Sequence, residues 1–466
     1  MKKLIALMLA LVMVLSLTAC GSSEPAATEA PATEAPKTET PATEAPTEAA
    51  SLLGTQPVEI VFWHSASDEA GLLMEKYIND FNANNEYQIT VKPVYQGQYS
   101  DATKLLSTMI SGQNYKELPD VMQMDATGKV TYYKSGKAFT VDAAMAAFPV
   151  EGLLDNYLSG ALGNWQFAGA QLGLPFATST TITYANMDLL KQAGWDKAPD
   201  TFADVIALQA DMEKAGMTQK VIQALPNTPT LANWIGQLGS YVVDQSNGAD
   251  GTATKLEMID NDALATFLTE WKAMYDAGAL ISESSSNDKF IAGEVVLMTS
   301  SSANITNIIN KVGGAFEVGV GTYLRVNEDA SYGATVSGSC VVMFDSEDDL
   351  RKEASWVFAQ YLASAAVQAD FAAGTGYIPA HVDAMEAESY KNLIAEYPQH
   401  AVSFTQLSNT PAAMRSVTVG PTIDFYYGIQ ECISDMLSYG QTVEETVEIM
   451  DETLNGLLYQ YQQNNG

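Results

Sequence analysis

The chain has 466 residues, 47% of them hydrophobic, which is enough apolar material for two or three domains with large cores. Its 23 basic and 56 acidic residues give a net charge of −33. A surface this acidic is repelled by phosphate backbones and by anionic lipids, so the composition argues against nucleic-acid binding.

The N-terminal residues predict an exported, lipid-anchored protein. Lys2 and Lys3 precede an apolar run at 4–17, which is typical of a signal peptide and short for a membrane span. The small residues before Cys20 look like a lipobox, which predicts cleavage before Cys20 and its acylation; an ordinary signal peptide is the alternative. Residues 21–50 repeat Pro, Ala, Thr and Glu without aromatic, Leu, Ile or Val residues, so we expect a disordered acidic tether over 21–55.

The folded body opens with a strand–helix–strand pattern. We expect a strand at 58–62, an amphipathic helix that ends near 82–85, and a second strand at 89–91. Ser65 stands three residues before Asp68, as in a capping box. The pattern predicts a mainly parallel sheet, in which ligands bind beyond the carboxyl ends of the strands.

Strands and helices then alternate along the chain, which favours α/β architecture throughout. The expected strands are 118–125, 178–184, 295–298 and 334–344, and the expected helices are 100–111, 130–136, 188–194, 201–216, 234–243, 262–277, 303–312, 350–371 and 443–461.

Motifs of catalysis and metal binding are missing from the sequence. It contains no HExxH, CxxC or GxSxG motif and no complete phosphate-binding loop, so we expect no cofactor and no metal. Residues 247–257 resemble a calcium loop only faintly, and a hairpin turn is the better interpretation. Paired carboxylates for glycoside hydrolysis stay open, because their separation is spatial. Export permits a disulfide between Cys340 and Cys432, but two buried free thiols are the favoured alternative.

Several motifs together resemble the extracellular solute-binding proteins, family 1, of ATP-driven importers. They are Phe62-Trp-His64, the NDFNANNEY stretch at 79–87, Gly173-Leu-Pro-Phe176, the FIAGEVVLM stretch at 290–298 and Thr375-Gly-Tyr-Ile-Pro379. Their order covers residues 57 to about 460, and the glycerol-3-phosphate-binding members are the most similar.

The resemblance implies a two-lobe (type II) α/β fold, with a mixed sheet and flanking helices in each lobe. Strands would cross between the lobes near 173–182 and 333–343, and the chain would cross again after Tyr377. The N-terminal lobe would comprise 56–175 and 333–385, and the C-terminal lobe 176–332 and 386–466.

The ligand of such a protein lies in the cleft between the lobes. Family positions carried over to this chain are Tyr99, Asp125, Ser179, Ser301, Gly338 and Tyr377. Trp63, His64 and Trp234 are further candidates, each with a structural role as its alternative. Asp424 falls where the glycerol-3-phosphate-binding members carry an arginine. A carboxylate there would repel phosphate, so we hypothesise a neutral or cationic ligand, although Arg415 stands close enough in sequence to replace the missing charge.

The expected function is therefore binding without catalysis. The resemblance implies a monomeric receptor, lipid-anchored on the extracytoplasmic face of the cell membrane, that captures a sugar, oligosaccharide or polyol such as glycerol-3-phosphate by lobe closure and delivers it to permease subunits. A secreted carbohydrate-active enzyme and a sensor or adhesion lipoprotein are the alternatives.

Overall fold

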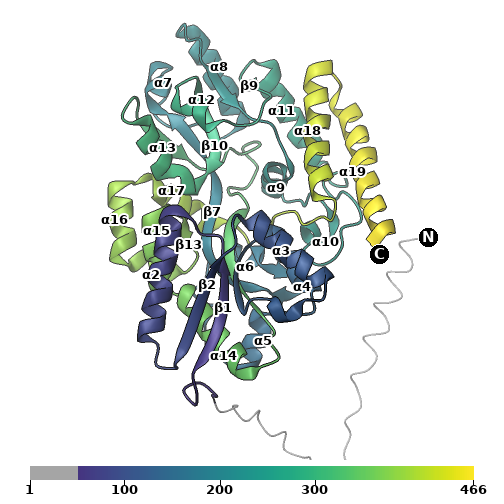
Figure 1. Ribbon diagram of the computed structural model, residues 1–466. Helices are drawn as coiled ribbons and strands as arrows, with labels where there is room; N and C mark the ends of the chain where they lie inside the picture. Colours follow the sequence, from purple (N-terminus) through teal and green to yellow (C-terminus); the bar gives the residue numbers. More distant parts are fainter. Residues whose placement is uncertain (1–50, 466) are drawn as a thin grey trace, which may run out of the picture. The chain divides into compact units, whose positions relative to one another are not determined.

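The computed structural model describes residues 51–465 (Figure 1). The predicted signal peptide, Cys20 and residues 21–50 of the predicted tether lie outside the described residues. Between residues 51 and 465, no helix combines the length and the apolar character that crossing a membrane requires.

One mixed sheet of eleven strands organises the described residues. Its main path runs β2-β1-β3-β12-β7-β10-β8-β9. The bounds are β1 (Val58–His64), β2 (Ile89–Tyr95), β3 (Val121–Asp125), β7 (Gly173–Asn186), β8 (Lys220–Gln223), β9 (Leu280–Ile281), β10 (Val295–Ser301) and β12 (Val336–Phe344). β4 (Ala138–Phe139) pairs with β12, while β11 (Val318–Gly321) and β13 (Ile378–Pro379) pair with β7. β5 (Gln166–Phe167) and β6 (Ala170–Gln171) form a separate hairpin.

The opening pattern is confirmed. β1 pairs in parallel with both β2 and β3, because the helix between β1 and β2 returns the chain to the same end of the sheet. The expectation of a mainly parallel sheet was wrong: the sheet as a whole is mixed, since β12 pairs antiparallel with β3 and with β7 and β10 pairs antiparallel with β7.

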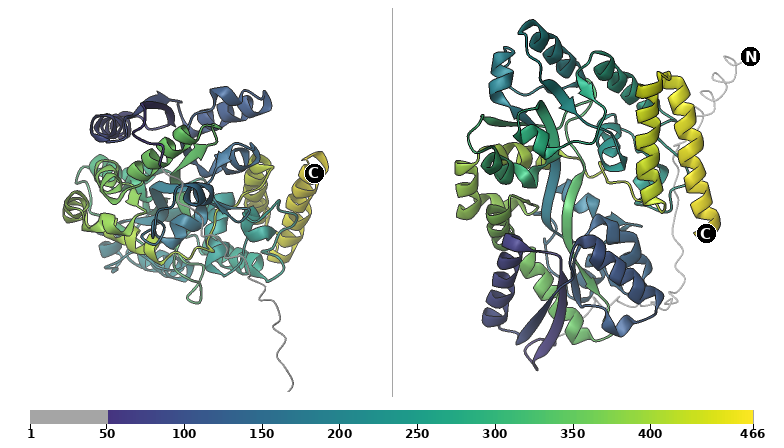
Figure 2. Two further views of the ribbon diagram at one scale, coloured as in Figure 1. Left: turned by 90° about the horizontal axis from the view of Figure 1, so that it is seen from below. Right: turned by 45° about the horizontal axis from the view of Figure 1, so that its top comes forward.

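The long strand β7 divides the sheet into two halves. Its first part pairs with β12, and residues 181–185 pair with β10. In Figures 1 and 2, β7 runs between one group of elements that includes β1, β2 and α14 and another that includes β10, α8 and α11.

Helices cover both halves. In chain order they are α2 (Asp68–Asn84), α3 (Tyr99–Ser111), α4 (Lys129–Lys134), α5 (Val141–Ala147), α6 (Ser159–Asn164), α7 (Met187–Gln192), α8 (Phe202–Lys214), α9 (Thr228–Gln237), α10 (Asp244–Gly248), α11 (Ala263–Asp276), α12 (Asn287–Ile291), α13 (Ile305–Val312), α14 (Asp349–Leu362), α15 (Ala365–Thr375), α16 (Glu388–Glu396), α17 (Gln399–Asn409), α18 (Thr422–Tyr439) and α19 (Val443–Asn465), with short 3₁₀ turns at η1 (Tyr115–Glu117), η2 (Ala126–Gly128), η3 (Ser302–Asn304) and η4 (Val382–Glu386).

Each half has its own apolar core. One core packs β1, α2 and α14 around Phe62, Phe81 and Phe358, and the Phe358 ring contacts each of the other two rings edge to face. The other packs α8, α9, α11, α18 and α19 around Trp234 and Trp271. The first core includes Leu174 of β7 and Val341 of β12, and the second includes Ala185 near the other end of β7, so shared strands join the two α/β halves.

Three local predictions were wrong. α2 begins after Ser67 rather than Ser65, because the Ser65 N–H donates to Gln123 Oε1 instead of starting the helix. The helix expected at 234–243 starts earlier, at Thr228, since Asn227 and Thr230 form a reciprocal cap. The helix expected at 350–371 breaks into α14 and α15, with Ser364 in an extended conformation between them.

Other local predictions were confirmed. Thr201 and Asp204 form the expected capping box of α8. Cys340 and Cys432 are buried free thiols, and they lie in different apolar clusters. In contrast, residues 247–257 do not form the expected plain hairpin turn, because the left-handed turn α10 lies between Val243 and Leu256, the two residues of a single antiparallel bridge.

Candidate ligand-binding site

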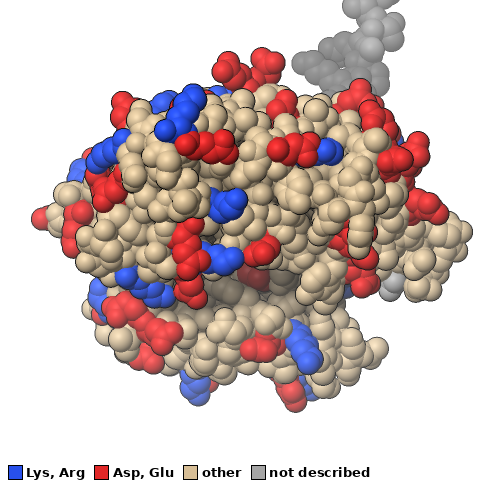
Figure 3. All heavy atoms as spheres, turned by 90° about the horizontal axis from the view of Figure 1, so that it is seen from above, with Lys and Arg blue, Asp and Glu red and all other residues tan. Residues whose placement is uncertain are grey.

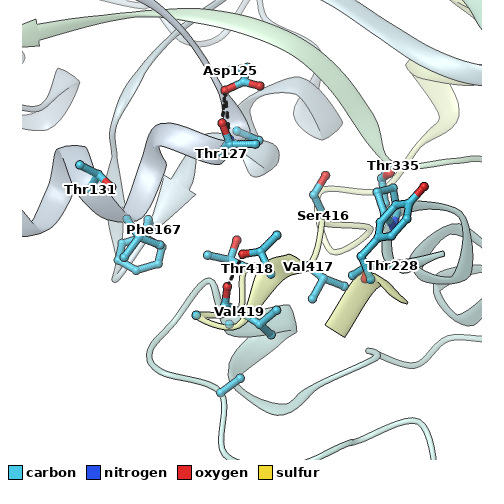
Figure 4. Close-up of a pocket in the computed structure, with 18 of the residues that line it drawn as sticks. Asp125, Thr127, Thr131, Phe167, Thr228, Thr335, Ser416, Val417, Thr418 and Val419 are labelled. Atoms are coloured by element: carbon cyan, nitrogen blue, oxygen red, sulfur yellow. Dashed lines mark hydrogen bonds between the residues drawn. The ribbon is translucent and has the colours of Figure 1, made fainter. Parts of the chain in front are cut away.

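A first cavity of about 560 Å³ lies where the two halves meet (Figure 4). Asp125, Thr127, Thr131 and Phe167 line it from β3, η2, α4 and β5, while residues 416–420 and the helices α18 and α19 line it from the other side. In Figure 4 the Asp125 and Thr127 side chains lie across the cavity from Thr418 and Val419. Apolar groups such as Phe167, Val417 and Leu458 share the wall with hydroxyl groups, which suits a ligand with both apolar and polar faces.

Asp125 is held in place by its own strand end. Its Oδ1 accepts hydrogen bonds from the Thr127 N–H at 3.2 Å and from the Thr127 hydroxyl at 2.6 Å. Burial raises the pKa of Asp125, and the hydrogen bonds from Thr127 oppose that shift. The two bonds engage Oδ1, so Oδ2 is the oxygen that would accept a hydrogen bond from a ligand.

A second cavity of about 330 Å³ is lined mostly by hydroxyl groups. None of the fifteen described residues that line it carries a charge, and eleven of them are Ser, Thr or Tyr. They are Ser179, Thr180, Thr181, Ala224, Leu225, Asn227, Thr230, Trp234, Ser284, Ser285, Thr299, Ser300, Ser301, Ser337 and Tyr426. Because hydroxyl groups both donate and accept hydrogen bonds, this lining matches a neutral polyhydroxylated group.

Gly338 shapes the strand between the two cavities. A Cβ built on it would lie 1.9 Å from the Ala177 carbonyl oxygen, and its φ is +102°. The register of β12 on β7 shifts between Gly338 and Cys340, as at a β-bulge. Only glycine fits this close approach, and the bulge presents the neighbouring Ser337 to both cavities.

Five of the ten predicted binding residues line these two cavities. Asp125 and Gly338 line the first, while Ser179, Trp234 and Ser301 line the second. Trp234 also belongs to the core: its Nε1 donates to the Leu324 carbonyl at 3.1 Å, and only 2% of its surface is exposed.

Tyr99 and Tyr377 lie near Asp125, although neither lines the two cavities described here. Burial, followed by the proximity of Tyr377, raises the pKa of Tyr99, and Asp125 adds to the shift. Burial also raises the pKa of Tyr377, whose ring stacks on Phe371. The structure therefore brings Tyr99, Asp125 and Tyr377 into one neighbourhood.

Trp63, His64 and Asp424 lie outside both cavities. Trp63 is 4% exposed and belongs to an apolar cluster with Met122 and Tyr132. His64 stacks on Phe62, its Nδ1 has no partner among the described residues, and burial lowers its pKa. Asp424 is exposed on the first turn of α18.

Arg415 is committed to other groups. Its guanidinium donates to Gln166 Oε1 at 3.0 Å and to the Ala412 carbonyl at 3.1 Å, and it lies 3.7 Å from Asp250 Oδ1. It does not line either of the two cavities. Lys134, which is exposed, is the basic residue among those that line the first cavity.

Sequence reasoning missed Tyr426, Ser337 and the 416–420 segment. Phe425, Tyr426 and Tyr427 are three consecutive aromatic residues, and only the helical phase of α18 decides which ring faces the cavities. Phe425 is buried in the core and Tyr427 is 62% exposed, while Tyr426 lies between these extremes. Had a helix been predicted at 422–439, these three adjacent aromatic residues would have made Tyr426 a candidate for the site.

The site shows no feature of a metal centre. Within residues 51–465, no cluster of three His, Cys, Asp or Glu residues is placed to hold an ion.

Figure 3 shows a face of the molecule that is hollowed between two masses, with acidic and basic side chains interspersed around the hollow rather than gathered by sign.

Comparison with known proteins identifies the family. The family model for bacterial extracellular solute-binding proteins matches residues 76–400. The sn-glycerol-3-phosphate-binding periplasmic protein UgpB of Yersinia pestis is 25% identical over 371 residues, which is 76% of this chain and 81% of that protein.

Solved structures share the fold. The cyclic α-maltosyl-1,6-maltose-binding protein of Arthrobacter globiformis superposes with a TM-score of 0.73 at 15% identity, over 86% of this chain and 99% of that one. UgpB of Mycobacterium tuberculosis, solved with glycerophosphocholine, gives a TM-score of 0.68 at 17% identity, over 88% and 100%. The expected two-lobe fold is therefore confirmed, and the family is one of binding proteins rather than enzymes. The chain belongs to the family of bacterial extracellular solute-binding proteins.

Proposed function

We propose that this protein is a lipid-anchored receptor of an ATP-driven importer that captures an uncharged carbohydrate or polyol and delivers it to permease subunits. The observation that carries the proposal is the second cavity, in which hydroxyl groups predominate and charged residues are absent from the described lining. Ser179, Thr181 and Ser337 make no hydroxyl hydrogen bond to another described residue, so they are available to a ligand.

Support for an uncharged ligand comes from the distribution of cations. Phosphate recognition normally uses arginine in bidentate hydrogen bonds or a helix N-terminus together with lysine. Here Arg415 is engaged by Gln166 and Asp250, and it lines neither cavity. The described lining of the second cavity therefore offers no cation to a phosphate group.

Closure of two lobes is the proposed mechanism. The N-terminal lobe would contain β1, β2 and α14, the C-terminal lobe β8, β10 and α11, and β7 with β12 would join them. Contacts from both lobes to one ligand shift the equilibrium toward the closed state by the difference in binding free energy between the closed and open states. Tyr390, Leu393 and Leu407 pack with α15 and its neighbours, so α16 and α17 would move with the first lobe.

A binding titration tests the proposal. Calorimetric titration of the purified protein with neutral monosaccharides, disaccharides and polyols is expected to give binding, while glycerol-3-phosphate is expected to bind at least about tenfold more weakly than the best of them. A thermal-shift screen checks the same ranking, because a ligand stabilises by RT ln(1 + [L]/Kd). Tight binding of glycerol-3-phosphate without binding of neutral sugars would refute the uncharged ligand.

A further inference from the structure

The two cavities adjoin at two residues that line both of them. Ser337 on β12 and Tyr426 on α18 are the only residues that appear in the described lining of both. Each cavity falls within the roughly 300–1,000 Å³ that small-molecule sites occupy. A ligand confined to one cavity would leave the other empty, and a ligand of two linked units would fill both.

A hydrogen bond from Asn227, at the start of α9, holds Tyr426 in place between the cavities. Its hydroxyl oxygen accepts a hydrogen bond from Asn227 Nδ2 at 3.1 Å. Asn227 is itself immobilised as the N-cap of α9, because its Oδ1 accepts from the Thr230 N–H and its own N–H donates to Thr230 Oγ1. The next ring, Tyr427, stands nearly perpendicular to Tyr426 with centroids 5.2 Å apart. The ring is therefore held in position before any ligand binds.

The two cavities also differ in chemistry. The second offers hydroxyl groups and no charge in its described lining. The first offers apolar walls at Phe167 and Val419 and one carboxylate, Asp125. A hydroxylated unit that makes many hydrogen bonds suits the second cavity, while a unit with an apolar face and a hydroxyl aimed at a carboxylate suits the first.

We propose that the ligand is an oligosaccharide of at least two units that occupies both cavities, and that Tyr426 is the residue that determines this specificity at the junction. The inference rests on the proposed function and deepens it. An aromatic ring packs against the C–H face of a sugar, and its fixed position sets where the link between two units passes.

The test compares monosaccharides with their own disaccharides. The probes are glucose, galactose and mannose beside maltose, cellobiose, isomaltose, melibiose, lactose and mannobiose, titrated into wild type and into Tyr426→Ala, Tyr426→Phe and Tyr427→Ala. At least one disaccharide is expected to bind about tenfold more tightly than either of its component sugars. Tyr426→Ala is expected to remove that advantage while any monosaccharide affinity changes less than about twofold, and Tyr426→Phe, which keeps the ring, is expected to retain most of it.

Tyr427→Ala is the matched control, since it deletes the neighbouring ring on the exposed face of the same helix. Circular dichroism melting of each variant checks that α18 is intact. Equal affinity for a monosaccharide and its disaccharide, or equal losses for both in Tyr426→Ala, would overturn this inference and leave the proposed function standing. Binding of no sugar in the panel would overturn this inference, and binding of glycerol-3-phosphate alone would overturn both.

Discussion

At the scale of single residues, Gly338 is a position whose backbone conformation and close contacts leave no room for a side chain. Its φ of +102° and the 1.9 Å approach of a built Cβ to the Ala177 carbonyl act together. We expect Gly338→Ala to lower the free energy of unfolding by about 3 kcal/mol or more, because the strand pair β7–β12 must separate to admit the methyl group. Urea unfolding followed by tryptophan fluorescence measures the loss.

Gly216 supplies the control for Gly338. It also has a positive φ, +70°, but nothing lies within 4 Å of its built Cβ. Gly216→Ala should therefore cost only the conformational penalty of about 1 kcal/mol. Equal losses in the two variants would mean that the close contact at Gly338 has little energetic weight.

At the scale of elements, the left-handed turn α10 depends on one buried side chain. Gln245, Ser246 and Asn247 all have φ between 54° and 59°, a conformation that costs free energy for residues other than glycine. Asn247 Oδ1 accepts from the N–H groups of Val242 and Val243, and its Nδ2 donates to the Arg415 carbonyl.

Replacing the Asn247 side chain should destabilise the turn α10. We expect Asn247→Ala to reduce stability by about 2–4 kcal/mol, since it leaves buried backbone groups without partners. Ser246→Ala is the comparison, because it lies in the same left-handed turn and removes only one hydroxyl, which donates to Asp250. Chemical denaturation measures both, and a similar small effect would contradict the role assigned to Asn247. Because Gly248 lines the first cavity, ligand affinity should fall with Asn247→Ala as well.

Local periodicity and family motifs reveal different parts of this structure. The β1–α2–β2 unit and α11 follow from apolar spacing alone, and the resemblance points to Asp125, Ser179 and Gly338 as binding positions. The turn α10 has no apolar period and no glycine until Gly248, so nothing local predicts three consecutive left-handed residues. Tyr426 escapes prediction because its importance depends on which side of α18 meets α9, a contact set by packing of segments about 200 residues apart.

At the scale of the whole molecule, His400 joins α17 to α13 and makes stability depend on pH. It is fully buried in α17, with Nε2 3.2 Å from the Thr306 hydroxyl of α13. Burial lowers its pKa to about 4, from 6.5 in the unfolded chain. The unfolded chain thus binds the proton more readily between these values, so the stabilisation from neutral His400 is complete above pH 6.5 and declines as pH falls toward 4.

Because of His400, the free energy of unfolding is expected to be about 2 kcal/mol lower at pH 5 than at pH 7.5. His400→Gln, which keeps a hydrogen-bonding group and does not titrate, should show a smaller decrease than wild type over the same interval. Paired denaturation curves at the two pH values measure the difference. His381→Gln, at a partly exposed histidine, serves as the control, and an unchanged pH slope in His400→Gln would contradict the assignment.

The last helix is part of the cavity wall, and this bears on biosensor construction. A Cβ on Gly420 would coincide with the ring of Tyr461, at 2.1 Å from Cζ, so the end of α19 is seated directly on the segment that lines the first cavity. A fluorophore attached rigidly to α19 would move with that helix whenever ligand binding displaces residues 416–420. A fluorescent reporter of ligand binding is therefore best attached to α19, while a label that should not respond belongs on the turn at Gly216, which lines neither cavity.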